Sequence, residues 1–146
     1  MTVVVGLDPK TFISRPKLDL LERTYYPNER LLDKLIAAMW DKPEREWIFK
    51  MVREGGLEAY STGNALVLIE TAEWERGKEL FIFGMVGRDI LKRSKEVVED
   101  LKKIAEYKGC SMIGGQGVPR AWARWCPANG FKPVMTHYVM ELEDGK

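Results

Sequence analysis

The chain has 146 residues, of which 45% are hydrophobic and 31% are charged, and its formal net charge is +1. This length fits one domain over residues 1–146 with a sizeable buried core. The near-neutral charge gives no reason to expect a nucleic-acid partner. No apolar run approaches the roughly 20 residues of a membrane span, and no signal peptide is recognised, so we expect a cytoplasmic protein.

The two cysteines, Cys110 and Cys126, are far apart and form no CxxC motif. His137 is the only histidine, and no cysteine–histidine group has the spacing of a zinc site. We therefore expect no bound metal and no disulfide framework. A lone histidine such as His137 could act as a base, but it is more often structural or exposed.

The first third of the chain predicts helices. Residues 1–27 have weak periodicity and are expected to be irregular or short-helical, with an edge-strand candidate at residues 3–5. Asn28 is placed to cap a helix that carries a stripe of Leu31, Leu32, Leu35, Ile36 and Met39. A second helix is expected with Pro43 in its first turn and with Gly55 and Gly56 at its end. Its apolar face comprises Trp47, Ile48, Met51 and Val52.

From Leu57 the apolar period changes to two, which predicts strands over residues 57–61 and 65–74. Turn-forming residues 62–64 and 75–78 separate these strands from each other and from the run at residues 80–87. That run is apolar almost throughout, which predicts a strand buried on both faces.

The rest of the chain predicts a strand–helix–strand crossover. Asp89 is placed as the N-cap of a long amphipathic helix that ends at Gly109, and the mixed charges on this helix, Asp100 among them, predict a solvated face. A strand at 110–113, a glycine-rich turn at 114–117, a helix at 119–126 and a last strand at 136–143 follow. The glycine-rich turn lacks the spacing of a phosphate-binding loop. This order predicts a mixed α+β fold, a mostly antiparallel twisted sheet with helices on both faces.

This order of elements resembles the GNAT-type N-acetyltransferase superfamily over about residues 28–142. Residues 57–86 look like the family's meander and 89–108 like its central helix. Gly109-Cys110 resembles the start of the next strand, and the segment from Arg120 to the pair Gly130-Phe131 resembles the short helix with its Gly-Phe exit.

The resemblance implies a coenzyme A site after the strand at 80–87. In the family, an Arg/Gln-x-x-Gly-x-Gly/Ala turn exposes backbone N–H groups to the pyrophosphate. Here the turn has one glycine, carries the negative charge of Asp89, and offers nearby cations instead. The residues implied for acetyl-CoA binding are Phe83, Gly84, Met85, Val86, Gly87, Arg88, Lys92, Arg93 and Ser94.

The resemblance also implies catalytic positions. Cys126 stands where the family commonly has a tyrosine that protonates the leaving thiolate, although Pro127 predicts that this helix ends early. Glu70 and Glu73 are candidates for removing a proton from the amine, directly or through water. The alternatives are that these glutamates are solvated hairpin carboxylates and that Cys126 is a structural cysteine.

Two functions follow. The first is acetyl-CoA-dependent N-acyl transfer to an amine of a small molecule or a protein. The second is a non-catalytic GNAT-fold binding or assembly protein, such as one of phage origin, with a protein partner or a second copy of the chain. The five tryptophans and the altered phosphate turn favour the second function. Pairing of residues 81–87 with 110–115 along their whole length would exclude the first.

Overall fold

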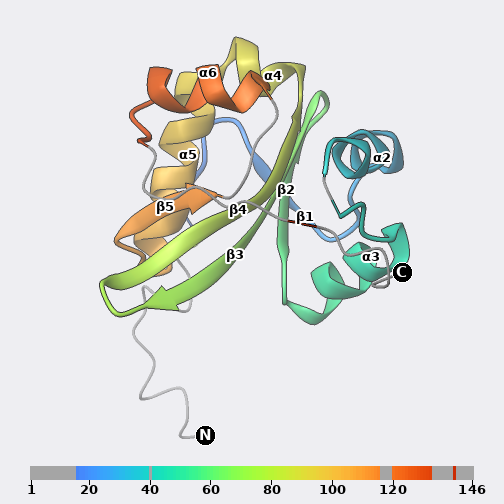
Figure 1. The fold of residues 1–146 in the computed structure, drawn as a ribbon, viewed down its shortest axis with the longest axis horizontal. Helices are drawn as coiled ribbons and strands as arrows, with labels where there is room; N and C mark the ends of the chain where they lie inside the picture. Colours follow the sequence, from blue (N-terminus) through green and yellow to red (C-terminus); the bar gives the residue numbers. More distant parts are fainter. Residues whose placement is uncertain (1–15, 40, 116–119, 133–139, 141–146) are drawn as a thin grey trace, which may run out of the picture.

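The structure is a computed structural model that describes residues 16–39, 41–115, 120–132 and 140 (Figure 1). The chain forms, in order, β1 (Glu22–Thr24), α2 (Glu29–Ala38), α3 (Arg45–Glu54), β2 (Glu58–Thr62), β3 (Ala65–Trp74), β4 (Gly77–Gly87), α4 (Arg88–Lys92), α5 (Ser94–Tyr107), β5 (Met112–Gly115) and α6 (Arg120–Ala128).

The five strands form one sheet in the order β1-β2-β3-β4-β5. The first three pairs are antiparallel, and only β4 and β5 run parallel, because the α4–α5 crossover connects them. Helices α2 and α3 cover one face of the sheet, and α4, α5 and α6 lie on the other (Figure 1). The predicted α+β architecture is therefore confirmed.

Strand β3 supplies both layers of the core. Val67 and Ile69 pack in the cluster shared with α5, whereas Leu66 and Leu68 pack in the cluster shared with α2 and α3. All five residues from Ala65 to Ile69 are fully buried. Burying one such aliphatic side chain stabilises a fold by about 1.5–3 kcal/mol, so the centre of β3 is a large contributor to the folding free energy.

The prediction that the run at 80–87 is buried on both faces was wrong. Only Leu80 and Ile82 of β4 are buried, and the other residues of this strand are half-buried. Phe83 and Val86 pack only partly against the core cluster shared with α2 and α3, and Met85 only partly against the cluster shared with α5.

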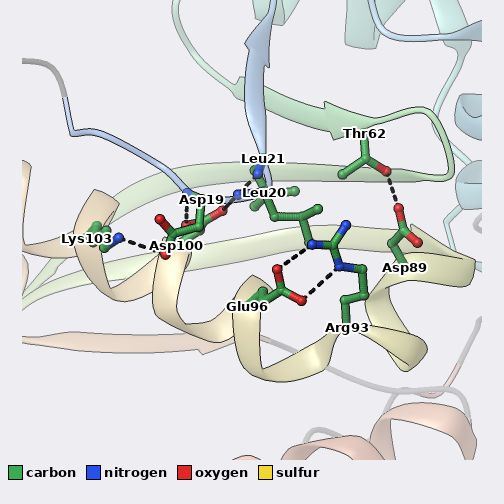
Figure 2. A network of polar contacts seen from close by, with 9 residues as sticks. All are labelled: Asp19, Leu20, Leu21, Thr62, Asp89, Arg93, Glu96, Asp100 and Lys103. Atoms are coloured by element: carbon green, nitrogen blue, oxygen red, sulfur yellow. Dashed lines mark hydrogen bonds and ion pairs between the residues drawn. The ribbon is translucent and has the colours of Figure 1, made fainter.

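Residues 16–27 are not irregular throughout, because Glu22–Thr24 form β1. This strand pairs antiparallel with β2, from Glu22↔Ser61 to Thr24↔Ala59. The segment before β1 is fastened to α5 by Asp100 (Figure 2). The carboxylate of Asp100 accepts hydrogen bonds from the backbone N–H groups of Asp19, Leu20 and Leu21, each at 2.8 Å. Asp100 is fully buried, so the expectation that it lies on a solvated face was also wrong.

The helical predictions were confirmed in α2 and α3 but needed correction elsewhere. Asn28 caps α2 through Leu31 N–H at 3.0 Å, and Gly55 ends α3 in the left-handed conformation. Pro43 precedes the first turn of α3 rather than lying in it, since Glu44 is the N-cap. In place of the single helix expected from Asp89 onward, the chain forms two helices, α4 and α5. They are separated at Arg93, where φ is −122° and ψ is 39°.

The last described elements are shifted from their predicted positions. Strand β5 begins at Met112, so Gly114 and Gly115 belong to it and not to a turn. Helix α6 continues through Pro127 to Ala128 instead of ending before the proline. Pro127 has no N–H to donate to the carbonyl four residues earlier, so it costs α6 one backbone hydrogen bond in its last turn. Gly130 then turns the chain with φ of 87°, and Phe131 N–H donates to the carbonyl of Cys126 at 2.9 Å.

Some predictions fall outside the described residues. They are the edge-strand candidate at 3–5, the end of the glycine-rich segment at 116–117, and His137. The expected strand at 136–143 lies there too, except for residue 140.

Candidate active site at the end of the fourth strand

Among the described residues, strands β4 and β5 are paired over four residues each. Their parallel register begins at Glu79↔Met112 and ends at Ile82↔Gly115. Strand β4 continues for five more residues, 83–87, or about 16 Å of extended chain, toward α4 (Figure 1). In the described part of the chain no strand accompanies it there on the β5 side. The residues that follow β5, 116–119, lie outside the described part of the chain, so pairing along the whole length, which would exclude acyl transfer, is not tested here.

A β-bulge lies directly after the last described β4–β5 pair. Across β3, Leu68 pairs with Gly84 and Ile69 pairs with Ile82, which leaves Phe83 as an extra residue in β4. A bulge bends the strand and redirects its peptide groups, and bulges are frequent beside functional sites. Gly84 follows the bulge, and a Cβ at this position would press on the Leu35 side chain of α2 at 2.9 Å. Glycine there lets α2 approach the strand closely.

The turn after β4 is fastened to the β2–β3 hairpin. Gly87 has φ of 118°, and a Cβ on it would collide with the backbone carbonyl of Asn64. Asp89 does not cap a helix: Gly87 occupies the N-cap position without a side-chain cap, and the Asp89 carboxylate accepts a hydrogen bond from Thr62 Oγ1 at 2.7 Å (Figure 2). The Asp89 N–H also donates to Asn64 O, at 3.4 Å. The negative charge of Asp89 is thus held by the hairpin.

Three cations surround this turn. Arg88 is exposed, and its Nη2 donates to Asn64 Oδ1 at 3.3 Å. Arg93 pairs with Glu96 one turn later; this pair raises the pKa of Arg93 and lowers that of Glu96 (Figure 2). Lys92 is exposed at the end of α4. The other residues predicted to bind the cofactor lie in β4 (Phe83, Gly84, Met85, Val86 and Gly87) and at the start of α5 (Ser94).

Cys126 reaches the same end of the sheet through α6. The neighbouring Trp125 is buried, and its Nε1 donates to the backbone carbonyl of Ile90 in α4 at 2.9 Å. This bond joins α6 to the turn after β4. The Cys126 side chain is half-buried against the same core cluster, and burial raises the pKa of its thiol. The thiol is therefore protonated at neutral pH, as a proton donor must be.

The two predicted glutamates lie at different heights on β3. Glu70 pairs with Phe81, close to the last β4–β5 pair, and burial raises the pKa of its carboxyl. It lines a polar cavity of about 150 Å³ with Gly55, Gly56, Glu58, Ile69, Thr71 and Lys108. Glu73 is exposed and pairs with Lys78, four residues or about 13 Å along β4 from Ile82. Glu70 is thus the nearer of the two to the end of the β4–β5 pairing.

No sequence signal pointed to Thr62 or Asn64 as parts of this site. Thr62 and Asn64 looked like ordinary turn residues, and their contacts with Asp89 and Arg88 span 27 and 24 positions. Among the described residues there is no group of three or more side chains that could hold a metal ion. No described helix is long and apolar enough to cross a membrane.

Comparisons with solved structures identify the fold. A probable acetyltransferase superposes with a TM-score of 0.59 at 10% identity, over 86% of this chain and 99% of that one. An aminoglycoside N-acetyltransferase in complex with CoA gives 0.56 at 11% identity, over 90% and 99%. An aminoglycoside acetyltransferase from an uncultured soil metagenomic sample, in complex with sisomicin, gives 0.55 at 13% identity, over 84% and 95%.

No protein-family model and no curated protein sequence matches the chain. The structural likeness is nevertheless extensive, because it covers most of this chain and nearly all of each of the three neighbours. The chain has the fold of the GNAT acetyltransferases, with a mixed five-stranded sheet and a parallel β4–β5 pair.

Proposed function

We propose that this protein is an acyl-CoA-dependent N-acyltransferase that moves an acetyl group to an amine. The observations that carry the proposal are the fold, which an acetyltransferase in complex with CoA shares, and the β-bulge at Phe83 in β4. Backbone N–H and C=O groups that a strand does not use in its own sheet can bind an extended partner. The amide-containing arm of coenzyme A has the hydrogen-bonding groups to lie along residues 83–86 as such a partner.

The remainder of the cofactor would lie at the turn after β4. The turn lacks a glycine-rich backbone cradle, and the N–H of Asp89 is already directed to Asn64. The diphosphate would therefore be held mainly by side-chain charge, from Arg88 and Lys92 together with Arg93. The Thr62–Asp89 hydrogen bond supports this arrangement because it turns the Asp89 carboxylate toward the hairpin.

Acetyl-CoA supplies an activated thioester, whose carbonyl carbon is attacked by the amine nitrogen as the C–S bond breaks. Glu70 would accept the proton that the nitrogen loses, directly or through water. Burial raises the pKa of Glu70 toward neutral pH, which makes its carboxylate a stronger base. Cys126 would donate its thiol proton to the departing sulfur. The polar cavity beside Glu70 gives room for part of an acceptor.

The competing function is binding or assembly without catalysis. The observation in its favour is the same turn, in which the Asn64 carbonyl takes up the Asp89 N–H, a donor that would otherwise face a diphosphate. A GNAT fold without a working phosphate site would be expected to bind acetyl-CoA weakly or not at all.

Calorimetric titration of the purified full chain with acetyl-CoA tests the proposal, with desulfo-CoA as a second ligand. We expect micromolar affinity and a loss of at least fivefold on Lys92→Ala or Arg88→Ala. Arg30→Ala, which removes an exposed charge from α2, is the matched control and should bind as the wild type does. Absence of binding at high protein concentration would refute the enzyme proposal and favour the binding function.

A further inference from the structure

A second pocket lies at the opposite edge of the sheet, between β1, β2 and the end of α5. It has a volume of about 470 Å³, within the range of small-molecule sites. Its lining is partly apolar, partly aromatic and partly charged: Pro16, Leu18, Leu21, Glu22, Arg23, Glu58, Tyr60, Tyr107 and Lys108. None of these residues belongs to β4, α4 or α6, where acetyl-CoA is proposed to bind, although Glu58 and Lys108 also line the cavity beside Glu70.

The charges in this pocket are unevenly matched. Glu58 forms ion pairs with both Lys108 and Arg23, the latter at 3.7 Å, and all three side chains are only 18–28% exposed. The hydroxyl of Tyr60 donates to Glu58 Oε1 at 3.1 Å, and burial raises the pKa of Tyr60 to about 12, so it stays neutral. Two cations therefore share one partly buried carboxylate. Glu22, which also lines the pocket, is exposed to solvent.

Arg23 has an unused hydrogen-bond donor in this cluster. Its Nε is buried and has no hydrogen-bond partner, an uncommon state for a buried polar atom. The guanidinium is held in place by the rings of Tyr25 and Tyr60, at 4.8 and 5.8 Å from their centroids. A guanidinium fixed in this way can bind a carboxylate through paired N–H donors of its two Nη groups.

We propose that this pocket binds a small organic anion with a flat apolar body, of the aromatic carboxylate class. The carboxylate would pair with Arg23 and Lys108 and supply the negative charge that Glu58 alone does not. The ring would lie against Leu18, Leu21 and the tyrosines. Arg23 and Tyr60 are a residue pair of β1 and β2. Strand β2 is two strand spacings, about 10 Å, from β4, where acetyl-CoA is proposed to bind. Binding of the anion therefore does not require bound acetyl-CoA.

An amide-resolved NMR titration of the full chain, without coenzyme, tests this site. The probes are benzoate and its neutral analogue benzamide. We expect benzoate to bind with millimolar or better affinity, with the largest shifts at Arg23, Tyr60 and Lys108, and benzamide to bind at least tenfold more weakly. Arg23→Lys keeps the charge but removes the paired donors, and should weaken benzoate at least tenfold. Arg30→Lys, at an exposed position on α2, is the matched control and should change nothing.

Equal affinity for benzoate and benzamide would overturn the proposal, because the pocket would then select for apolar shape only. Unchanged benzoate binding by Arg23→Lys, or shifts scattered away from the pocket, would overturn it as well. If Arg23→Lys loses the amide dispersion of a folded protein, Lys108→Gln replaces it, with an expected loss of at least threefold. Failure of the Lys108 variant to weaken benzoate would likewise count against the site.

Discussion

Replacement of Asp100 by asparagine should destabilise the protein far more than an ordinary charge removal. The Asp100 carboxylate is fully buried and accepts three backbone hydrogen bonds, from Asp19, Leu20 and Leu21. Asparagine has nearly the same shape, but it has one acceptor oxygen instead of two and no charge. Its amide nitrogen would face at least one of the same N–H donors.

The magnitude follows from the number of bonds lost. A hydrogen bond to a charged group contributes roughly 1.5–3 kcal/mol, and a buried donor left without a partner costs about 1–3 kcal/mol. Two of the three bonds depend on Oδ2, and the third on Oδ1. Asp100→Asn should therefore reduce the free energy of unfolding by about 3–5 kcal/mol. This is a large part of the 5–15 kcal/mol typical of a domain.

Urea denaturation followed by circular dichroism measures this change. With a slope of about 2 kcal/mol per molar, the midpoint should fall by roughly 2 M. Asp33→Asn is the matched control, because Asp33 pairs with Arg45 on the exposed surface and should contribute less than about 1 kcal/mol. Hydrogen exchange should also become faster at the amides of residues 19–21. A loss below 1 kcal/mol with unchanged exchange there would refute the reasoning.

Three further outcomes are expected. Gly87→Ala should reduce stability by about 2–4 kcal/mol in a thermal melt, because its φ of 118° and the nearby Asn64 carbonyl exclude a Cβ; a loss under 0.5 kcal/mol would contradict this. Trp125→Phe should cost about 2 kcal/mol through the lost bond to Ile90, and a neutral result in urea denaturation would argue against that contact. Because burial raises the folded-state pKa of Glu70, its proton favours the folded state most at pH below the unfolded pKa, and this stabilisation is lost as pH rises through the folded pKa. The wild type should therefore lose stability relative to Glu70→Gln as pH rises above about 4. The rate of acyl transfer should rise over the same pH range, because the base is then deprotonated. Parallel stability curves of the two proteins would contradict the raised pKa of Glu70.

The sequence by itself determined the elements whose signals are local. Period-two patterning defined β2 and β3, Asn28 and Gly55 marked helix ends, and the order of elements was enough to indicate the GNAT architecture. These features depend on neighbours a few residues apart, so their pattern is visible in the chain itself. The same holds for the hairpin turns between β2, β3 and β4.

Only the tertiary structure decided what depends on distant partners. Asp89 looked like a helix cap and Asp100 like a surface charge, yet the first is bound by Thr62 and the second by backbone 79 to 81 positions away. The half-burial of β4 likewise depends on how its side chains meet the two core clusters on opposite faces of the sheet. A side chain's sequence neighbours specify its secondary structure, but its burial and hydrogen-bond partners are set by segments that meet only after the sheet has formed.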